Sequence, residues 1–182
     1  MKNVTPSPMK LYILRHGEAA EPGDPKFASD AERPLTPKGI QRTKLLAYTL
    51  RRMEISFDVI FSSPLVRARE TAEIVERGLR LHGRLEFTDH LAPAGDMEKL
   101  LVQIHGLRPA PENLLLVGHE PYLSSLISLL STGGPNLSLT LKKGGLCRLE
   151  AKQLSCARCA SLEWLLAPRL LGPKRKKSKA EG

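Results

Sequence analysis

The sequence predicts an α/β fold: a three-layer α/β/α sandwich with a mainly parallel sheet that ends in an antiparallel hairpin. Short apolar runs, which suit buried strands, alternate with longer segments of helical spacing, as is typical of a parallel sheet covered by helices. Near the C-terminus, two apolar runs are separated only by a short polar turn, which indicates a hairpin. With 182 residues and 41% hydrophobic content, the chain can bury one sizeable core.

Capping residues and prolines give the boundaries of the expected elements. Thr36 and Pro37 suit an N-cap and a first helical position, Asp96 suits another N-cap, and Pro64 and Pro121 each open a helix. A loop rich in Pro, Gly, Asp and Ser is expected over the strand ends at 19–34. The expected helices are 37–51, 64–79, one after 96 and one after 121; the expected strands are 11–14, 57–61, 85–87, 113–117, 145–154 and 160–166, with a turn at 155–159.

The net charge of +9 is concentrated at the C-terminus. Five of the last nine residues are Lys or Arg, against one acidic residue, and this run follows Pro173. Such a run is typical of a disordered tail that binds polyanions weakly, so we expect no sequence-specific nucleic-acid recognition. We therefore expect a flexible N-terminal segment at 1–9, a single domain at 10–171 and a basic, disordered tail at 172–182.

Features of an exported or membrane protein are lacking. No apolar run reaches the roughly 18–20 residues that span a bilayer, and residues 1–9 contain no apolar core of a secretory signal. Three cysteines in such a chain fit a reducing compartment, so we expect a cytoplasmic location. Cys156 and Cys159 have the spacing of metal ligands, but a second pair is lacking. We expect them to be ordinary residues of the hairpin turn, and we expect no metal and no cofactor.

Arginine and histidine side chains follow three of the expected strands. Arg15 and His16 follow strand 11–14, Arg67 falls in the first turn of the helix after strand 57–61, and His119 follows strand 113–117. Because open α/β sheets bind ligands at the carboxyl ends of their strands, we expect these four side chains to meet. The free N–H groups of the helix start beside Arg67 would favour an anion there.

These side chains are suited to phosphoryl transfer. Two arginines form a planar, permanently charged clamp for phosphoryl oxygens, but they cannot act as acids or bases. A neutral imidazole can attack phosphorus and form a phosphohistidine, and two nearby cations should keep His16 neutral. His119 could then stabilise the transferring group or carry a proton. Gly17 allows a tight turn that leaves room for a ligand.

Three motifs in order resemble the signature of the histidine phosphatase (phosphoglycerate mutase-like) superfamily. They are Arg15-His16-Gly17 after an apolar strand, Ser62-Ser63-Pro64-Leu65-Val66-Arg67-Ala68, and Gly118-His119-Glu120. Within that superfamily the chain is most similar to the short SixA-type phosphohistidine phosphatases, through residues 33–36, 91–96 and 162–168. The resemblance implies a phosphoglycerate mutase-like fold, with His16 as nucleophile and with Arg15, Arg67 and His119 completing the phosphate pocket.

The chain also departs from larger members of that superfamily. Those members carry a glutamate general acid just before the loop that begins here at Leu91, where this sequence has Asp89 and His90. Glu18 is another candidate acid and, with Gly17, a candidate substrate-binding residue. The Asn-bearing continuation of the mutases is absent, and the chain is too short for the lid insertions that enclose sugar phosphates. An uncovered pocket suits a phosphorylated side chain presented by another protein.

Three functions are compatible with these residues. The leading one is a signalling enzyme that removes phosphate from a phosphohistidine of a phosphotransfer protein. The second is a phosphomonoesterase for a small metabolite. The third is a phosphoprotein-binding module without turnover, although the intact His16 argues against it.

Overall fold

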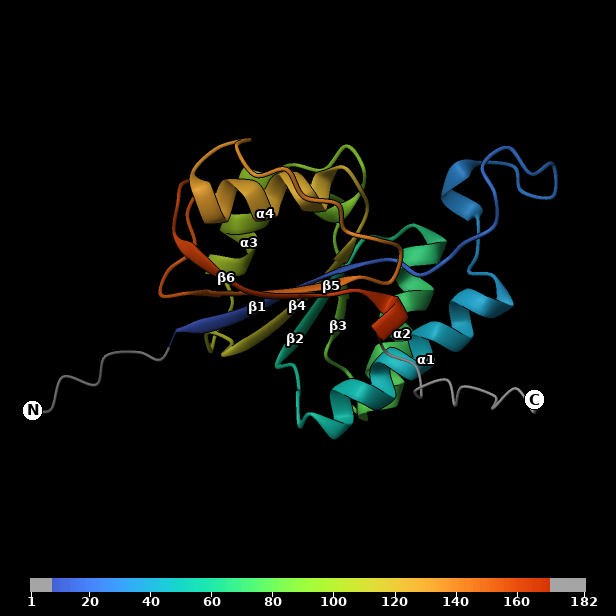
Figure 1. Ribbon diagram of the computed structural model, residues 1–182, viewed down its shortest axis with the longest axis horizontal. Helices are drawn as coiled ribbons and strands as arrows, with labels where there is room; N and C mark the ends of the chain where they lie inside the picture. The colour runs from blue at the N-terminus through green and yellow to red at the C-terminus, as the bar shows by residue number, and fades with distance from the viewer. Residues whose placement is uncertain (1–7, 171–182) are drawn as a thin grey trace, which may run out of the picture.

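The computed structural model describes residues 8–170, and its strands form one six-stranded sheet (Figure 1). Along the sheet the order is β3-β2-β4-β1-β5-β6. The first four of these strands are mutually parallel, whereas β5 is antiparallel to β1 and to β6. This arrangement confirms the mainly parallel sheet with a C-terminal hairpin. The strands are β1 (Met9–Arg15), β2 (Val59–Ser62), β3 (Leu85–Phe87), β4 (Asn113–Gly118), β5 (Leu146–Ala151) and β6 (Ala160–Leu166).

Helices cover both faces of the sheet. Alternate residues of a strand point to opposite faces, so Leu11 and Ile13 of β1 pack with α3 and α4, whereas Tyr12 and Leu14 pack with α1 and α2. The result is the expected three-layer sandwich (Figure 1). Buried side chains form one apolar core on each side of the sheet. The helices are α1 (Pro37–Arg52), α2 (Val66–Leu79), α3 (Met97–His105) and α4 (Tyr122–Thr132), with short 3₁₀ turns η1 (Asp30–Glu32), η2 (Asp89–Leu91) and η3 (Pro168–Leu170).

The register of the parallel strands brings three strand ends together. Arg15 pairs with Gly118, and Ser62 pairs with Val117, so the residues that follow these pairs are neighbours. His16 N donates to the Gly118 carbonyl at 3.0 Å. The chain leaves β1 for α1 on one face and leaves β4 for α4 on the other face. Adjacent strands whose connections go to opposite faces leave a crevice at their carboxyl ends, which is where such sheets bind ligands.

Several boundaries differ from the predicted ones. Helix α2 begins at Val66 instead of Pro64, because the Ser63 hydroxyl accepts a hydrogen bond from Leu65 N at 3.3 Å and holds a turn before the helix. Helix α4 begins one residue after Pro121, which is its N-cap. Strand β5 ends at Ala151 instead of 154, because Leu154 turns into the core and is 1% exposed. The connection between β5 and β6 is therefore longer than the predicted turn.

The predicted terminal segments lie almost entirely outside the described residues. This applies to the whole basic tail at 172–182 and to residues 1–7 of the N-terminal segment. Met9, the last residue of the predicted flexible segment, belongs to β1 and pairs with Ala151. Between residues 8 and 170, no helix combines the length and hydrophobicity that crossing a bilayer requires.

Candidate active site

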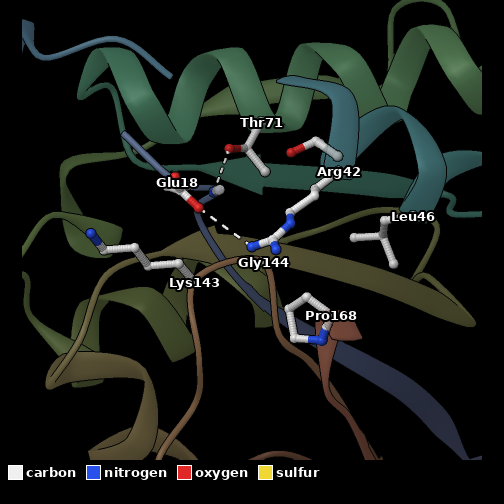
Figure 2. A pocket seen from close by; sticks show the side chains of 9 residues that line it. Glu18, Arg42, Leu46, Thr71, Lys143, Gly144 and Pro168 are labelled. Carbon is white, nitrogen blue, oxygen red and sulfur yellow. Dashed lines mark hydrogen bonds and ion pairs between the residues drawn. The ribbon is translucent and has the colours of Figure 1, made fainter. Parts of the chain in front are cut away.

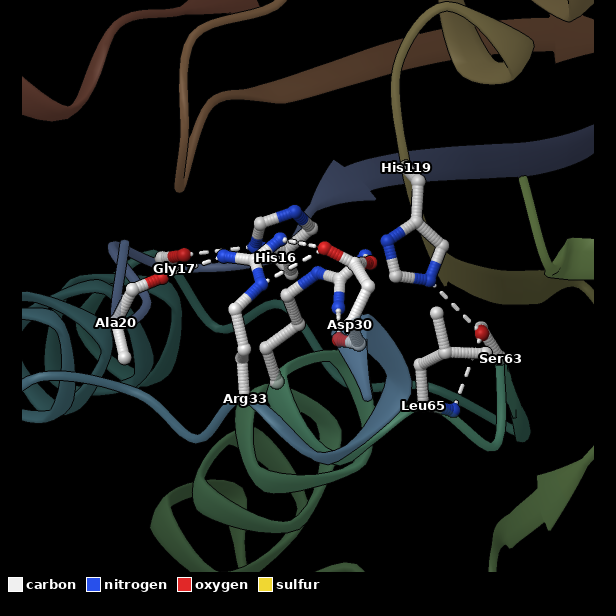
Figure 3. Close-up of polar contacts among 9 residues, drawn as sticks. His16, Gly17, Ala20, Asp30, Arg33, Ser63, Leu65 and His119 are labelled. Atoms are coloured by element: carbon white, nitrogen blue, oxygen red, sulfur yellow. Dashed lines mark hydrogen bonds and ion pairs between the residues drawn. The ribbon is translucent and has the colours of Figure 1, made fainter. Parts of the chain in front are cut away.

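The imidazoles of His16 and His119 lie together at the ends of β1 and β4 (Figure 3). Their ring centroids are 5.0 Å apart, and both residues are buried. His16 Nδ1 is 2.8 Å from the Gly17 carbonyl oxygen. Because a carbonyl oxygen only accepts, Nδ1 must carry the proton of the neutral ring, and the lone pair is on Nε2. His16 Nε2 is therefore the nitrogen that could attack phosphorus.

A serine from the neighbouring strand end orients His119. His119 Nε2 is 2.8 Å from Ser63 Oγ, as Figure 3 shows. Its Nδ1 is buried and has no hydrogen-bond partner within residues 8–170. When the Ser63 hydroxyl donates to Nε2, the proton of the neutral ring is on Nδ1 and can be donated to a phosphoryl oxygen. The sequence motif contained Ser63, but the pairing becomes visible only through the strand register.

The two arginines are anchored by their terminal nitrogens. Arg15 Nη1 donates to the Leu141 carbonyl at 2.9 Å, and Arg67 Nη1 donates to the Asp30 carbonyl at 2.7 Å. The Nε atoms of both arginines are buried and have no hydrogen-bond partner in the described part of the chain. Unsatisfied buried donors are costly and uncommon. Together with His119 Nδ1 they form a set of nitrogens that suits an anion with several oxygens, such as a phosphoryl group.

Asp30 and Arg33 belong to this arrangement, although sequence reasoning assigned their segment only to a loop. Asp30 Oδ2 accepts from Arg67 Nη2 at 2.9 Å, and Asp30 Oδ1 accepts from Arg33 Nε at 2.8 Å. Partial burial opposes ionisation of Asp30, but the hydrogen bond from Arg33 and the charges of both arginines outweigh it, so its pKa is lowered. The only available signal was Arg33, which lies in the stretch 33–36 that carried the family resemblance.

Gly17 packs against α1 and donates its N–H to Thr71 Oγ1 of α2 at 3.0 Å, and Figure 2 shows Glu18 beside Arg42 of α1. A Cβ on Gly17 would lie 2.9 Å from Thr43 Oγ1, so close packing against α1 requires the glycine. The gap beside it has a volume of only about 10 Å³, too small for a phosphoryl group. The Glu18 carboxylate is 3.1 Å from Lys38 Nζ and 3.4 Å from Arg42 Nη1. Its ion pairs therefore lie with α1, and among residues 8–170 it makes no hydrogen bond to either imidazole.

Asp89 and His90 lie in η2, which follows β3 at the same edge of the sheet. The turn is capped by Thr88, whose hydroxyl accepts from His90 N at 3.3 Å. Asp89 is exposed and His90 is half-buried. Within the described residues, the side chain of neither makes a hydrogen bond or ion pair to His16 or His119. Both candidate acids therefore lie at the same edge of the sheet as the imidazoles, but no hydrogen bond within the described residues joins them to either ring.

Cys156 and Cys159 lie in the connection between β5 and β6, as expected. Cys159 Sγ accepts from Ser155 N at 3.4 Å, a contact within the turn. All three cysteines of the chain have free thiols. In residues 8–170, no group of three or more His, Cys, Asp or Glu side chains is placed to hold a metal ion.

The pKa values of both imidazoles are strongly lowered. For His16, burial is the largest cause and the charges of His119, Arg67 and Arg15 add to it, so the pKa falls to about 3 despite the hydrogen bond to Gly17. For His119, burial followed by the charge of Arg67 lowers the pKa to about 4. The predicted effect of the arginines on His16 has the right direction, but desolvation contributes more than they do.

Comparison with known proteins identifies this arrangement. Residues 11–110 match the model of the histidine phosphatase superfamily (branch 1). The chain belongs to the histidine phosphatase superfamily. It is 31% identical over 126 residues to phosphohistidine phosphatase SixA of Escherichia coli, which covers 69% of this chain and 76% of that protein. The solved structure of SixA complexed with tungstate matches with a TM-score of 0.76 and 26% identity, over 90% of this chain and 100% of that one.

Another curated relative is also a phosphatase by name, but the match is shorter. The Escherichia coli adenosylcobalamin/alpha-ribazole phosphatase is 37% identical over 67 residues, which is 37% of this chain and 32% of that protein. The family model and the structural match therefore establish the superfamily and its phosphoglycerate mutase-like fold for this chain, but not its substrate.

The lowered pKa values predict how this histidine phosphatase responds to pH. Between pH 8 and 5, the ring signals of His16 and His119 should show no titration in NMR spectra, whereas an unperturbed histidine titrates near 6.5. In the unfolded chain both rings bind a proton below about pH 6.5, but the folded protein binds it only near pH 3–4. The free energy of unfolding should therefore decrease as pH falls from about 6.5 toward 4.

Urea unfolding at a series of pH values measures this effect. The slope of the unfolding free energy against pH should be smaller in the His16→Asn and His119→Asn variants, because each removes one group that titrates differently in the folded and unfolded states. An exposed histidine, changed in His105→Asn, is the matched control. Ring signals that titrate near pH 6.5 in the folded wild type would contradict the prediction.

Proposed function

We propose that this protein is a phosphohistidine phosphatase that acts on a phosphorylated histidine of a phosphotransfer protein. In the first step, His16 Nε2 attacks phosphorus, and the bond between phosphorus and the substrate's imidazole nitrogen breaks. In the second step, water attacks the phosphoryl group on His16 and releases inorganic phosphate, which restores the neutral imidazole. Splitting hydrolysis into two displacements is the usual advantage of a covalent intermediate.

One observation carries this proposal: three buried nitrogens without partners belong to Arg15, Arg67 and His119, the residues whose charges act on the His16 ring. Arg15 Nε, Arg67 Nε and His119 Nδ1 lack hydrogen-bond acceptors in the described part of the chain. An oxyanion would satisfy all three, and the charge that accumulates on phosphoryl oxygens during transfer would strengthen these bonds. The similarity to a SixA structure that was solved with tungstate, itself an oxyanion, supports the same assignment.

The proposed substrate class rests on the similarity to SixA and on leaving-group chemistry. A protonated phosphohistidine releases a neutral imidazole, whereas an alkyl phosphate releases a strongly basic oxygen that needs a proton in the transition state. Within residues 8–170, the side chains of Glu18, Asp89 and His90 make no hydrogen bond to His16, so none of these candidate acids is joined to the nucleophile. A cytoplasmic location is part of the proposal, since three free thiols fit a reducing compartment.

We expect turnover to follow the leaving group. The enzyme should dephosphorylate a phosphohistidine protein readily, p-nitrophenyl phosphate more slowly, and 3-phosphoglycerate very slowly. The measurement is kcat/KM for the three substrates at one pH, with a chelator and without added metal. A preference of about 100-fold or more for phosphohistidine over 3-phosphoglycerate is expected, because general acid catalysis typically contributes 10²–10⁴-fold.

A phosphatase for a small metabolite is the second candidate, favoured by the similarity to the alpha-ribazole phosphatase. The variants Asp89→Asn, His90→Ala and Glu18→Gln distinguish the two candidates. If an alkyl phosphate is the best substrate and one of these variants removes that activity selectively, the site has a general acid. The protein is then a phosphatase for a small metabolite, and our proposal is wrong. If p-nitrophenyl phosphate binds without any turnover, the protein is a binding module.

A further inference from the structure

A wide basic pocket opens directly beside the proposed phosphate site. Its volume is about 700 Å³, and Arg15, one of the two arginines of the phosphate site, is part of its wall. Four further cations line it, and none of its lining residues is acidic. The lining residues are Arg15, Arg42, Thr140, Lys142, Lys143, Ala167, Pro168 and Arg169.

The loop that carries the two lysines is fixed to the strand that carries the nucleophile. Gly144 N lies 3.0 Å from the Arg15 carbonyl and 2.9 Å from the His16 carbonyl. On its other side, Leu141 N donates to Glu120 Oε1 at 3.0 Å. The Glu120 of the Gly-His-Glu motif therefore anchors this loop. Lys142 and Lys143 are exposed, but their backbone is held at a set position relative to His16.

The charge of this pocket is largely uncompensated. Arg42 pairs with Glu18, but no other cation of the pocket forms an ion pair with a carboxylate within residues 8–170. Like charges brought together oppose folding, so their concentration at one edge of a phosphate site points to a ligand with negative charge. A single phosphoryl group would occupy only a small part of this volume. The pocket therefore has room for further anionic groups beside the one that is transferred.

We propose that the basic pocket binds an acidic segment that flanks the phosphorylated histidine of the partner protein; this inference rests on the proposed function. The cations come from four separate segments of the chain, at 15, 42, 142–143 and 169, and Lys142, Lys143 and Arg169 are long, exposed side chains. Such a spread suits several carboxylates along a peptide better than one compact group.

The test compares two phosphohistidine peptides that differ only in their flanks. One carries four Asp or Glu residues beside the phosphohistidine, and the other carries Asn or Gln at those positions. We expect wild type to favour the acidic peptide by about tenfold in kcat/KM at low ionic strength, and we expect this ratio to fall toward unity at about 0.5 M salt. In a Lys142→Gln, Lys143→Gln, Arg169→Gln variant the ratio should be near unity at low salt as well.

The matched control removes the same charge at the opposite edge of the sheet. Arg51 and Arg52 end α1, and Lys152 follows β5, so all three lie away from the pocket. The triple variant Arg51→Gln, Arg52→Gln, Lys152→Gln lowers the net charge by the same amount as the pocket variant. This control should keep the tenfold ratio. A wild-type ratio near unity, or a preference that survives the pocket substitutions, overturns the inference.

Binding measurements separate this inference from the proposed function. Fluorescence anisotropy with the His16→Asn variant gives the dissociation constants of both labelled peptides whether or not the enzyme hydrolyses them. If wild type turns over neither peptide, the proposed function fails, but the ratio of dissociation constants still tests the pocket. Fructose 1,6-bisphosphate and fructose 6-phosphate test a small ligand in the same way. If the bisphosphate binds more tightly by a factor larger than the ratio between the two peptides, and the pocket variant removes that difference, the pocket binds a metabolite and our inference is wrong.

Discussion

Replacing His16 with alanine is expected to reduce turnover of p-nitrophenyl phosphate by on the order of 10⁴-fold or more, because the variant has no nucleophile and the remaining site can only assist water. Hydrogen bonding of Nδ1 to Gly17 leaves Nε2 as the attacking atom. Wild type mixed briefly with substrate and quenched without acid should therefore carry phosphate on His16 Nε2. Mass spectrometry and ³¹P NMR of the quenched protein detect this phosphohistidine.

Two controls support the interpretation of this result. The exposed His105 lies on α3. The His105→Ala variant should keep wild-type turnover and should still form the phosphorylated intermediate when it is quenched. The His16→Ala protein should show a cooperative thermal transition, which excludes unfolding as the cause of the loss. If His16→Ala retains substantial activity, or if phosphate is trapped on His119 instead, the assignment of the nucleophile is wrong.

Removing either arginine of the site is expected to have the next largest effect. Arg15→Ala and Arg67→Ala should each raise the barrier by about 2–4 kcal/mol, the cost of losing one preorganised donor to a developing anion. Lysine should rescue poorly at both positions, because the buried Nε of each arginine is a donor with a fixed direction that an ammonium cannot reproduce. The measurement is kcat/KM for p-nitrophenyl phosphate in all four variants.

A nearby arginine provides the control for this series. Arg69 lies on the same helix as Arg67 but is exposed and pairs with Glu73, so Arg69→Ala should change kcat/KM by less than about twofold. Because Arg67 also holds Asp30 in η1, the thermal midpoint of Arg67→Ala should be compared with that of Asp30→Ala. Activity near wild type with lysine at both sites would show that charge alone is sufficient.

The elements predicted correctly are those whose signals are local in the chain. The apolar run that includes Leu11–Leu14 can only be a short buried strand, and Thr36 does accept the hydrogen bond of Gly39 N as an N-cap. The predicted end of β5 was wrong because tertiary packing decided it. Leu154 ended β5 by packing into the core, a choice that depends on neighbours that local sequence does not reveal.

The sequence by itself determined the α/β class, the family and the positions of Arg15, His16, Arg67 and His119 at or just after strand ends, because each rests on short motifs or on apolar patterns that can be read along the chain. Only the tertiary structure decided which groups those side chains contact. Asp30 reaches Arg67 across 37 positions of the sequence, and the lysine loop reaches Arg15 across 126. Such contacts depend on the order and register of the strands, which place β4 and β5 on either side of β1, and no local pattern of residues encodes that order.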